Sequence, residues 1–131
     1  MSPTVVIAVL VAGAVGTVIR WALSKLLAGK SALPVTVLVV NVVGSALAGM
    51  LLAQHTTGTM SDGVYLVLLT GFCGGLTTFS TFSVDSIQLV LAGRIRTAAL
   101  NVLANLALGV AAAWLAFAIT SAMLPPMAYP L

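Results

Sequence analysis

The sequence is poor in charged residues, in cysteine and in histidine. Its 131 residues include five Lys or Arg and two Asp or Glu, so only 5% of the chain is charged. An ordinary soluble domain is about 25% charged, and so few charges cannot cover the surface of a water-soluble monomer. The single Cys73 and the single His55 exclude an internal disulfide, a thiolate cluster and a His-based metal site or catalytic triad within one chain. We therefore expect no enzyme. The few basic residues do not form a clustered face, so no nucleic-acid binding is expected either.

Hydrophobic residues are abundant instead. They make up 61% of the chain, whereas disordered chains are poor in them. A helix rises about 1.5 Å per residue and the hydrocarbon core of a membrane is about 30 Å thick, so the length allows about six crossings, or about four with loops. The composition predicts an all-α, multi-pass protein of the cell membrane. Residues 1–131 are expected to form a single transmembrane domain in contact with lipid.

Four apolar segments define the predicted spans. The helices are expected at about residues 4–27, 34–53, 64–92 and 98–123. The first segment lacks the positively charged start of a signal peptide, so we interpret it as a spanning helix. The polar connections are expected at residues 28–31, 54–63 and 93–96. Pro125-Pro126 cannot continue the last helix.

The third segment is longer than a straight span needs and has an unusual centre. Paired glycines at Gly74 and Gly75 are followed by a run of hydroxyl residues that ends at Ser83, which is a poor composition for a helix interior. We predict a break near the centre of this helix, where the freed backbone groups would be satisfied by protein, by water or by an ion. The alternative is close helix packing through Gly71 and Gly75, which form a GxxxG pair.

Polar side chains fall at similar depth in three segments. They are Asn41 in the second segment, Asn101 and Asn105 on one face of the fourth, and Thr77, Thr78, Ser80, Thr81 and Ser83 at the expected break. Polar groups within a membrane need partners, so this set could line a narrow water-filled track of neutral donors. Taken singly, each residue is explained equally well by a hydrogen bond between helices.

Two phenylalanines lie beside the polar set. Phe79 and Phe82 are three residues apart and share a helix face. Packing is the usual role of such rings, but their positive edges could also coordinate a small anion beside the hydroxyl groups.

Arg20 lies inside the first segment, next to Trp21. It could anchor the helix at the membrane surface, or it could gather anions at the mouth of a water-filled vestibule. Asp85, further along the third segment, could cap, pair or titrate.

The run GFCGGLTTFSTFSVD at residues 71–85 resembles the signature of the small bacterial fluoride channels, the Fluc or CrcB-type family. Gly13 to Gly16 with Arg20-Trp21 resembles the glycine–arginine motif of the family's first helix, and residues 41–45 resemble the asparagine motif of its second helix. On the fourth helix the family often has Tyr and Ser where this chain has Asn101 and Asn105.

The resemblance implies a four-helix subunit that forms an antiparallel dimer with two fluoride pores. It implies passive and selective export of fluoride from the cytoplasm, with no organic cofactor. By the motif match, the pore lining would include Phe79, Phe82, Asn41, Thr78, Ser80 and Thr81, with Asn101 and Asn105 at the polar positions of the fourth helix. The backbone carbonyls of Gly74 and Thr77 would hold a structural sodium ion at the dimer centre, where broken-helix carbonyls favour a cation.

Two other classes of membrane protein are considered from the residues. A small proton-coupled, multidrug-type carrier also consists of four short helices in an antiparallel pair, but it needs a titratable acid deep in a helix. The only acids are Asp62, which we expect in a loop, and Asp85, which we expect near a helix end. A purely structural membrane subunit would not need the crowded hydroxyl groups.

The basic residues gather on one predicted side of the membrane. They are Lys25, Lys30, Arg94 and Arg96, with Arg20 leaning towards that side. The positive-inside rule places this side in the cytoplasm and the termini outside. An antiparallel dimer needs subunits inserted in both orientations. Its second subunit is therefore either another copy of this chain or a similar chain whose basic residues favour the opposite orientation.

Overall fold

The computed structural model describes residues 2–27 and 34–124, and within these two ranges all regular structure is helical. Four helical stretches are long and apolar enough to cross a membrane, so the prediction of an all-α, multi-pass membrane protein is confirmed. The elements are α1 Pro3–Leu27, α2 Val35–Thr56, α3 Asp62–Leu66, the π-helical segment η1 Val67–Cys73, α4 Gly74–Leu76, α5 Phe79–Leu91 and α6 Ile95–Met123. The third span comprises α3, η1, α4 and α5.

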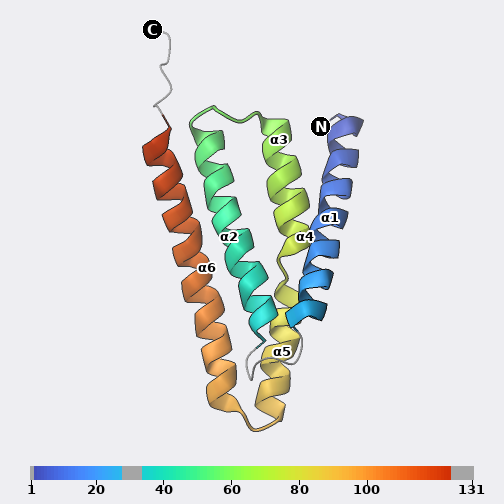
Figure 1. Cartoon of the computed structure of the whole chain (residues 1–131), viewed down its shortest axis with the longest axis vertical. Helices are drawn as coiled ribbons and strands as arrows, with labels where there is room; N and C mark the ends of the chain where they lie inside the picture. Colours follow the sequence, from blue (N-terminus) through green and yellow to red (C-terminus); the bar gives the residue numbers. More distant parts are fainter. Residues whose placement is uncertain (1, 28–33, 125–131) are drawn as a thin grey trace.

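The four spans lie side by side, in the order α6, α2, third span and α1 (Figure 1). The start of α1, the turn between α2 and α3 and the end of α6 share one end of this arrangement. α2 packs mainly against α6. The two helices approach closely at Gly49, where an added Cβ would collide with the backbone of Ala113.

The third span is broken, as predicted, and the break falls on the hydroxyl residues rather than on the glycines. Thr77 and Thr78 have extended backbone, with ψ angles of 160° and 121°. The glycines before them remain helical, in η1 and in α4. The break changes the neighbours of the span, because η1 and α4 pack against α1 whereas α5 packs against α6. One span therefore contacts both outer helices.

The glycines of the third span also form a packing face for α1. An added Cβ at Gly75 would collide with the carbonyl of Gly13, and one at Gly71 would lie 2.7 Å from the carbonyl oxygen of Val9. Small residues at this spacing let two helix backbones approach closely within a membrane. The break and the glycine packing, which the sequence presents as alternatives, thus occur together in one span.

Several observed boundaries differ from the predicted ones by two or three residues. α2 continues to Thr56, because the backbone N–H of Thr57 still donates to the Ala53 carbonyl at 3.0 Å. The hydroxyls of Thr56 and Thr57 donate to the same oxygen at 3.1 and 2.8 Å. Asp62 is the first residue of α3 and not a loop residue, which suits an acidic side chain because the helix dipole is positive there. α6 begins at Ile95 rather than at residue 98.

Some predicted features fall outside the described residues. These are the polar connection at residues 28–31, with Lys30, and the Pro125-Pro126 dipeptide.

Most large apolar side chains are exposed in the single subunit, while few are buried. Val40 and Leu76 are among the buried ones, whereas Leu10, Trp21 and Val110 are at least 60% exposed. Lipid tails cover apolar side chains as well as other helices do. Such exposure is therefore what a membrane-embedded subunit requires.

The tight contact between α1 and the third span predicts that two glycines of α1 differ in their tolerance of a side chain. A Cβ at Gly16 would collide with the carbonyl of Phe72 and lie 2.8 Å from the amide nitrogen of Leu76, whereas a Cβ at Gly13 meets only ordinary contacts, the nearest at 3.5 Å. We expect Gly16→Ala to lower the free energy of unfolding by about 1–3 kcal/mol, as overpacking does. Thermal unfolding in detergent measures the loss, with Gly13→Ala as the matched control. Equal stability of the two variants would contradict this packing.

Candidate functional site

The extended residues Thr77 and Thr78 redirect the hydrogen bonds of the third span. In an unbroken helix the Thr78 N–H would donate to the Gly74 carbonyl. It donates instead to Asn41 Oδ1 of α2 at 2.9 Å, while Asn41 Nδ2 donates to the Thr78 carbonyl at 3.2 Å. One amide side chain therefore satisfies both backbone groups of Thr78.

The side chain of Thr78 restarts the helix. Its Oγ1 accepts from the backbone N–H of Thr81 at 3.2 Å, which makes Thr78 the N-cap of α5. The same hydroxyl donates to Thr81 Oγ1 at 3.0 Å and lies 3.3 Å from Ser80 Oγ. These three hydroxyl residues therefore form one cluster at the start of α5.

The carbonyls of Gly74 and Thr77 lose their helical donors at the break. The Thr78 N–H turns away from Gly74, and the Thr81 N–H, which would otherwise donate to the Thr77 carbonyl, donates to a side chain. A Cβ added at Gly74 would meet nothing closer than the Leu69 carbonyl oxygen at 3.9 Å, so this residue is not packed tightly on that side. Backbone oxygens freed in this way can coordinate a hard cation.

A chain of amide groups links the break to α6. Asn41 Nδ2 donates to Asn105 Oδ1 at 3.0 Å, and Asn105 Nδ2 donates to Asn101 Oδ1 at 3.1 Å. Asn101 Nδ2 then donates to Ser86 Oγ at 2.9 Å, and Ser86 donates to the carbonyl of Phe82 at 2.7 Å. The chain joins α2, α6 and α5, and it leaves Asn101 only 2% exposed.

A pocket of about 290 Å³ opens beside the break. It is lined by Asn41, Ser45, Thr77, Thr78, Phe79, Phe82, Asn105 and Leu106. The two phenylalanine rings lie 5.8 Å apart between centroids and are tilted by 47°, and Phe79 is 79% exposed. The pocket therefore combines neutral polar groups with two aromatic rings, and none of its lining residues carries a titratable side chain.

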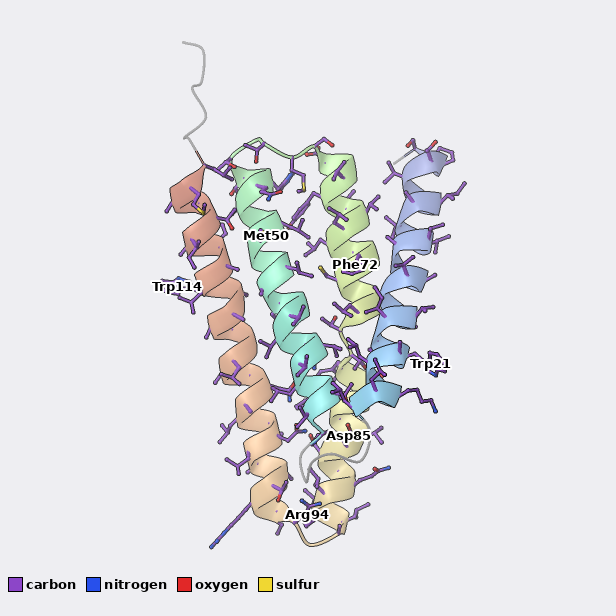
Figure 2. The ribbon with its side chains drawn as sticks, viewed as in Figure 1. Trp21, Met50, Phe72, Asp85, Arg94 and Trp114 are labelled. Atoms are coloured by element: carbon purple, nitrogen blue, oxygen red, sulfur yellow. The ribbon has the colours of Figure 1, made fainter. Side chains whose placement is uncertain are left out.

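Arg20 of α1 contacts the break on the side away from the pocket. Its Nε donates to the Gly75 carbonyl at 3.2 Å, and the hydroxyl of Thr17 donates to the same oxygen at 3.4 Å. Trp21 lies at the level of the break (Figure 2) and is 60% exposed, with Lys25 Nζ 6.0 Å from its ring. The first-helix arginine is thus bound to the broken span.

The structure brings together some of the predicted site residues and separates others. The pocket lining includes five of the predicted pore residues, which are Asn41, Thr78, Phe79, Phe82 and Asn105. It also includes Thr77, whose carbonyl is predicted to hold a metal ion. The lining does not include Ser80, Thr81, Asn101 or Arg20. Asn101 lies behind Asn105, where it positions its neighbours.

Three contributing residues received no role from the sequence. Ser45 lines the pocket, and its place one helical turn after Asn41 was a usable signal. Ser86 and Thr17 act through contacts with distant segments, so no local pattern marks them.

Comparison with known proteins gives a consistent result. The family described as CrcB-like protein, Camphor Resistance (CrcB), matches the chain over residues 7–117. A protein of Yersinia pseudotuberculosis serotype I named Fluoride-specific ion channel FluC 1 is 45% identical over 113 residues, which is 85% of this chain and 89% of the relative.

Two further relatives carry similar names. Fluoride-specific ion channel FluC of Escherichia fergusonii is 45% identical over 118 residues, covering 88% of this chain and 93% of the relative. Fluoride-specific ion channel FluC 2 of Rhodococcus jostii is 38% identical over 116 residues, covering 88% and 98%.

Proposed function

This chain belongs to the CrcB family, and on that basis we propose that it is a fluoride-specific channel through which fluoride leaves the cytoplasm passively. The family is one of channels and not of enzymes. The observation that carries the proposal is the pocket at the break, where uncharged amide and hydroxyl groups meet two phenylalanine rings.

The polar groups of the pocket suit a small anion that must enter and leave. In the single subunit the amides of Asn41 and Asn105 donate to nearby oxygens, and an entering fluoride would replace those oxygens as the acceptor. Neutral donors attract an anion without holding it as a full positive charge would, and conduction requires binding that is weak enough to reverse.

The two rings would contribute the remaining contacts. An aromatic ring has a positive edge, which can face an anion in a site with little water. Phe79 lies at the exposed side of the pocket and Phe82 is half-buried, so together they would form a path from the opening towards the polar groups.

The ring assignment predicts a specific loss of transport. Phe79→Ile and Phe82→Ile each keep an apolar side chain and remove the ring edge, so we expect fluoride efflux from proteoliposomes to fall by up to about tenfold. Phe117→Ile on α6, away from this pocket, is the matched control. A fluoride electrode records efflux without a proton gradient. Normal efflux from both variants would remove the rings from the pathway, and efflux that requires a proton gradient would indicate a proton-coupled carrier instead.

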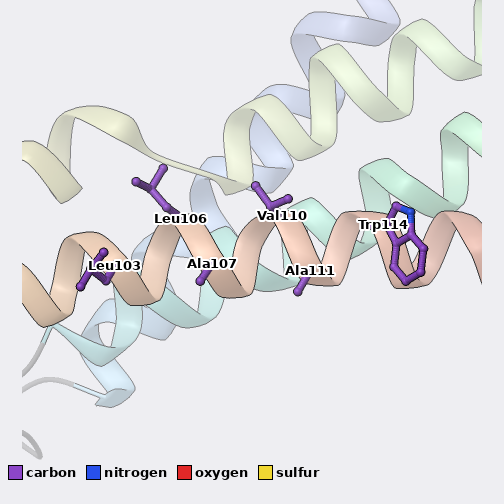
Figure 3. Close-up of a pocket in the computed structure, with 6 residues that line it drawn as sticks. All are labelled: Leu103, Leu106, Ala107, Val110, Ala111 and Trp114. Carbon is purple, nitrogen blue, oxygen red and sulfur yellow. The ribbon is translucent and has the colours of Figure 1, made fainter.

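We further propose that two subunits pair in antiparallel orientation and form two pores. The pocket at the break is open on one side. Exposure of its amides to lipid would be energetically unfavourable. Beside it, α6 presents a shallow apolar pocket of about 540 Å³ (Figure 3), lined by Leu103, Leu106, Ala107, Val110, Ala111 and Trp114. Leu106 borders both pockets, so one partner could cover the apolar face and close the polar opening.

The proposed pairing predicts dual insertion of this chain. Ser61 is exposed in the turn between α2 and α3, and its side chain caps nothing, so Ser61→Cys offers a label site that leaves the helices intact. The native Cys73 is buried and gives the background. We expect an impermeant maleimide to label Ser61→Cys from both sides of the membrane. Ala92→Cys lies in the turn at the other end of the spans, so the fraction of it labelled from one side should equal the fraction of Ser61→Cys labelled from the other side. Labelling of Ser61→Cys from the outside alone would mean that the channel needs a similar chain of opposite orientation.

A structural sodium ion fits the break. The carbonyls of Gly74 and Thr77 have lost their helical donors, and such oxygens suit a hard cation. Two oxygens do not complete the coordination of an ion, but a two-fold axis beside them would double the set. We propose that these carbonyls of both subunits hold sodium at the centre of the dimer.

The sodium proposal predicts a dependence on the cation that is separate from the fluoride gradient. Complete replacement of sodium by N-methylglucamine on both sides of the vesicle should abolish fluoride efflux and weaken the dimer in detergent, and returning sodium should restore both. Size-exclusion chromatography follows the dimer and the fluoride electrode follows transport. Full efflux and an intact dimer after exhaustive sodium removal would rule out the ion.

A further inference from the structure

The carbonyl of Gly75 is another backbone acceptor displaced by the break. In an unbroken helix it would accept the N–H of Phe79, but Phe79 begins α5 after two extended residues. The carbonyl accepts instead from Arg20 Nε at 3.2 Å and from Thr17 Oγ1 at 3.4 Å. Both replacement donors come from α1.

The backbone contact between α1 and the third span makes these bonds possible. Gly75 and Gly13 touch so closely that no Cβ fits at Gly75, and Gly16 is enclosed by the backbone around Phe72 and Leu76. Arg20 and Thr17 follow these glycines along α1. This contact therefore holds α1 at the position from which Arg20 and Thr17 reach the Gly75 carbonyl.

We infer that Arg20 is a positioning residue that holds the break open by replacing the missing donor of Gly75. A backbone carbonyl without a donor is strongly unfavourable in a membrane, so loss of this bond would favour a return of the Gly75 carbonyl to Phe79. Straightening of the span would compete with the bonds that Asn41 makes to Thr78. The first helix would thus set the geometry of the pocket on the far side of the span.

Two substitutions separate this role from the attraction of anions by charge. In lysine, a methylene group takes the position of the arginine Nε, so Arg20→Lys keeps the positive charge and removes the donor at that point. In glutamine, the amide nitrogen takes the position of Nε, so Arg20→Gln keeps the donor and removes the charge. Arg20→Lys therefore keeps what the attraction of anions needs, and Arg20→Gln keeps what the positioning of the Gly75 carbonyl needs.

Hydrogen exchange of the Thr78 amide reports on the break directly, because this N–H donates to Asn41 Oδ1 only while the span is broken. We expect Arg20→Lys to accelerate its exchange by at least about tenfold, which corresponds to the loss of one charge-assisted hydrogen bond. Arg20→Gln should stay within about threefold of the original protein. Thr17→Val removes the second donor of the Gly75 carbonyl, so it should accelerate exchange of the same amide by a smaller factor.

Fluoride efflux from proteoliposomes provides the second readout, and only this link rests on the proposed function. A positioning role predicts faster efflux through Arg20→Gln than through Arg20→Lys, whereas a role in gathering anions predicts the reverse. Unchanged exchange in both Arg20→Lys and Thr17→Val, or faster exchange in Arg20→Gln than in Arg20→Lys, would overturn the inference. If the original protein carried no fluoride, the channel proposal would fail while the exchange comparison would still decide the role of Arg20.

Discussion

The structure depends on one constraint, which is that backbone N–H and C=O groups inside a membrane need partners within the protein. A straight helix meets this requirement by itself, but the third span does not remain straight. At Thr77 and Thr78 the helical pattern stops, and several of the groups that it would have paired find other partners. Asn41 takes both groups of Thr78, and the Thr78 hydroxyl takes the N–H of Thr81.

These replacement partners connect the whole subunit. Arg20 and Thr17 reach the break from α1, and Asn41 reaches it from α2 and binds Asn105 of α6. The break also sends α5 towards α6 while η1 and α4 stay beside α1. A local interruption of one helix is therefore stabilised by all three other spans. The geometry of the pocket follows from how they pack.

The chemistry at the break is neutral, in keeping with a chain that is only 5% charged. The pocket contains amides, hydroxyls and aromatic rings, and the charged guanidinium of Arg20 lies on the other side of the span, bound to a carbonyl. A site of this kind offers hydrogen bonds and ring edges to an anion without a fixed opposite charge. This separation of charge from the pocket suits the proposed passive passage of fluoride.

The sequence by itself determined the membrane location, the four spans, the broken third helix and the family signature. These features follow from hydropathy and from local composition, because each segment must satisfy its own backbone and match the thickness of the membrane. Only the tertiary structure decided that Thr77 and Thr78, and not the glycines, are unwound, and that Gly71 and Gly75 pack against α1. It also placed Asn101 behind the pocket and Arg20 on the Gly75 carbonyl. Those outcomes depend on which distant donor reaches which freed acceptor, and that choice is made by the packing of helices that are far apart in the chain.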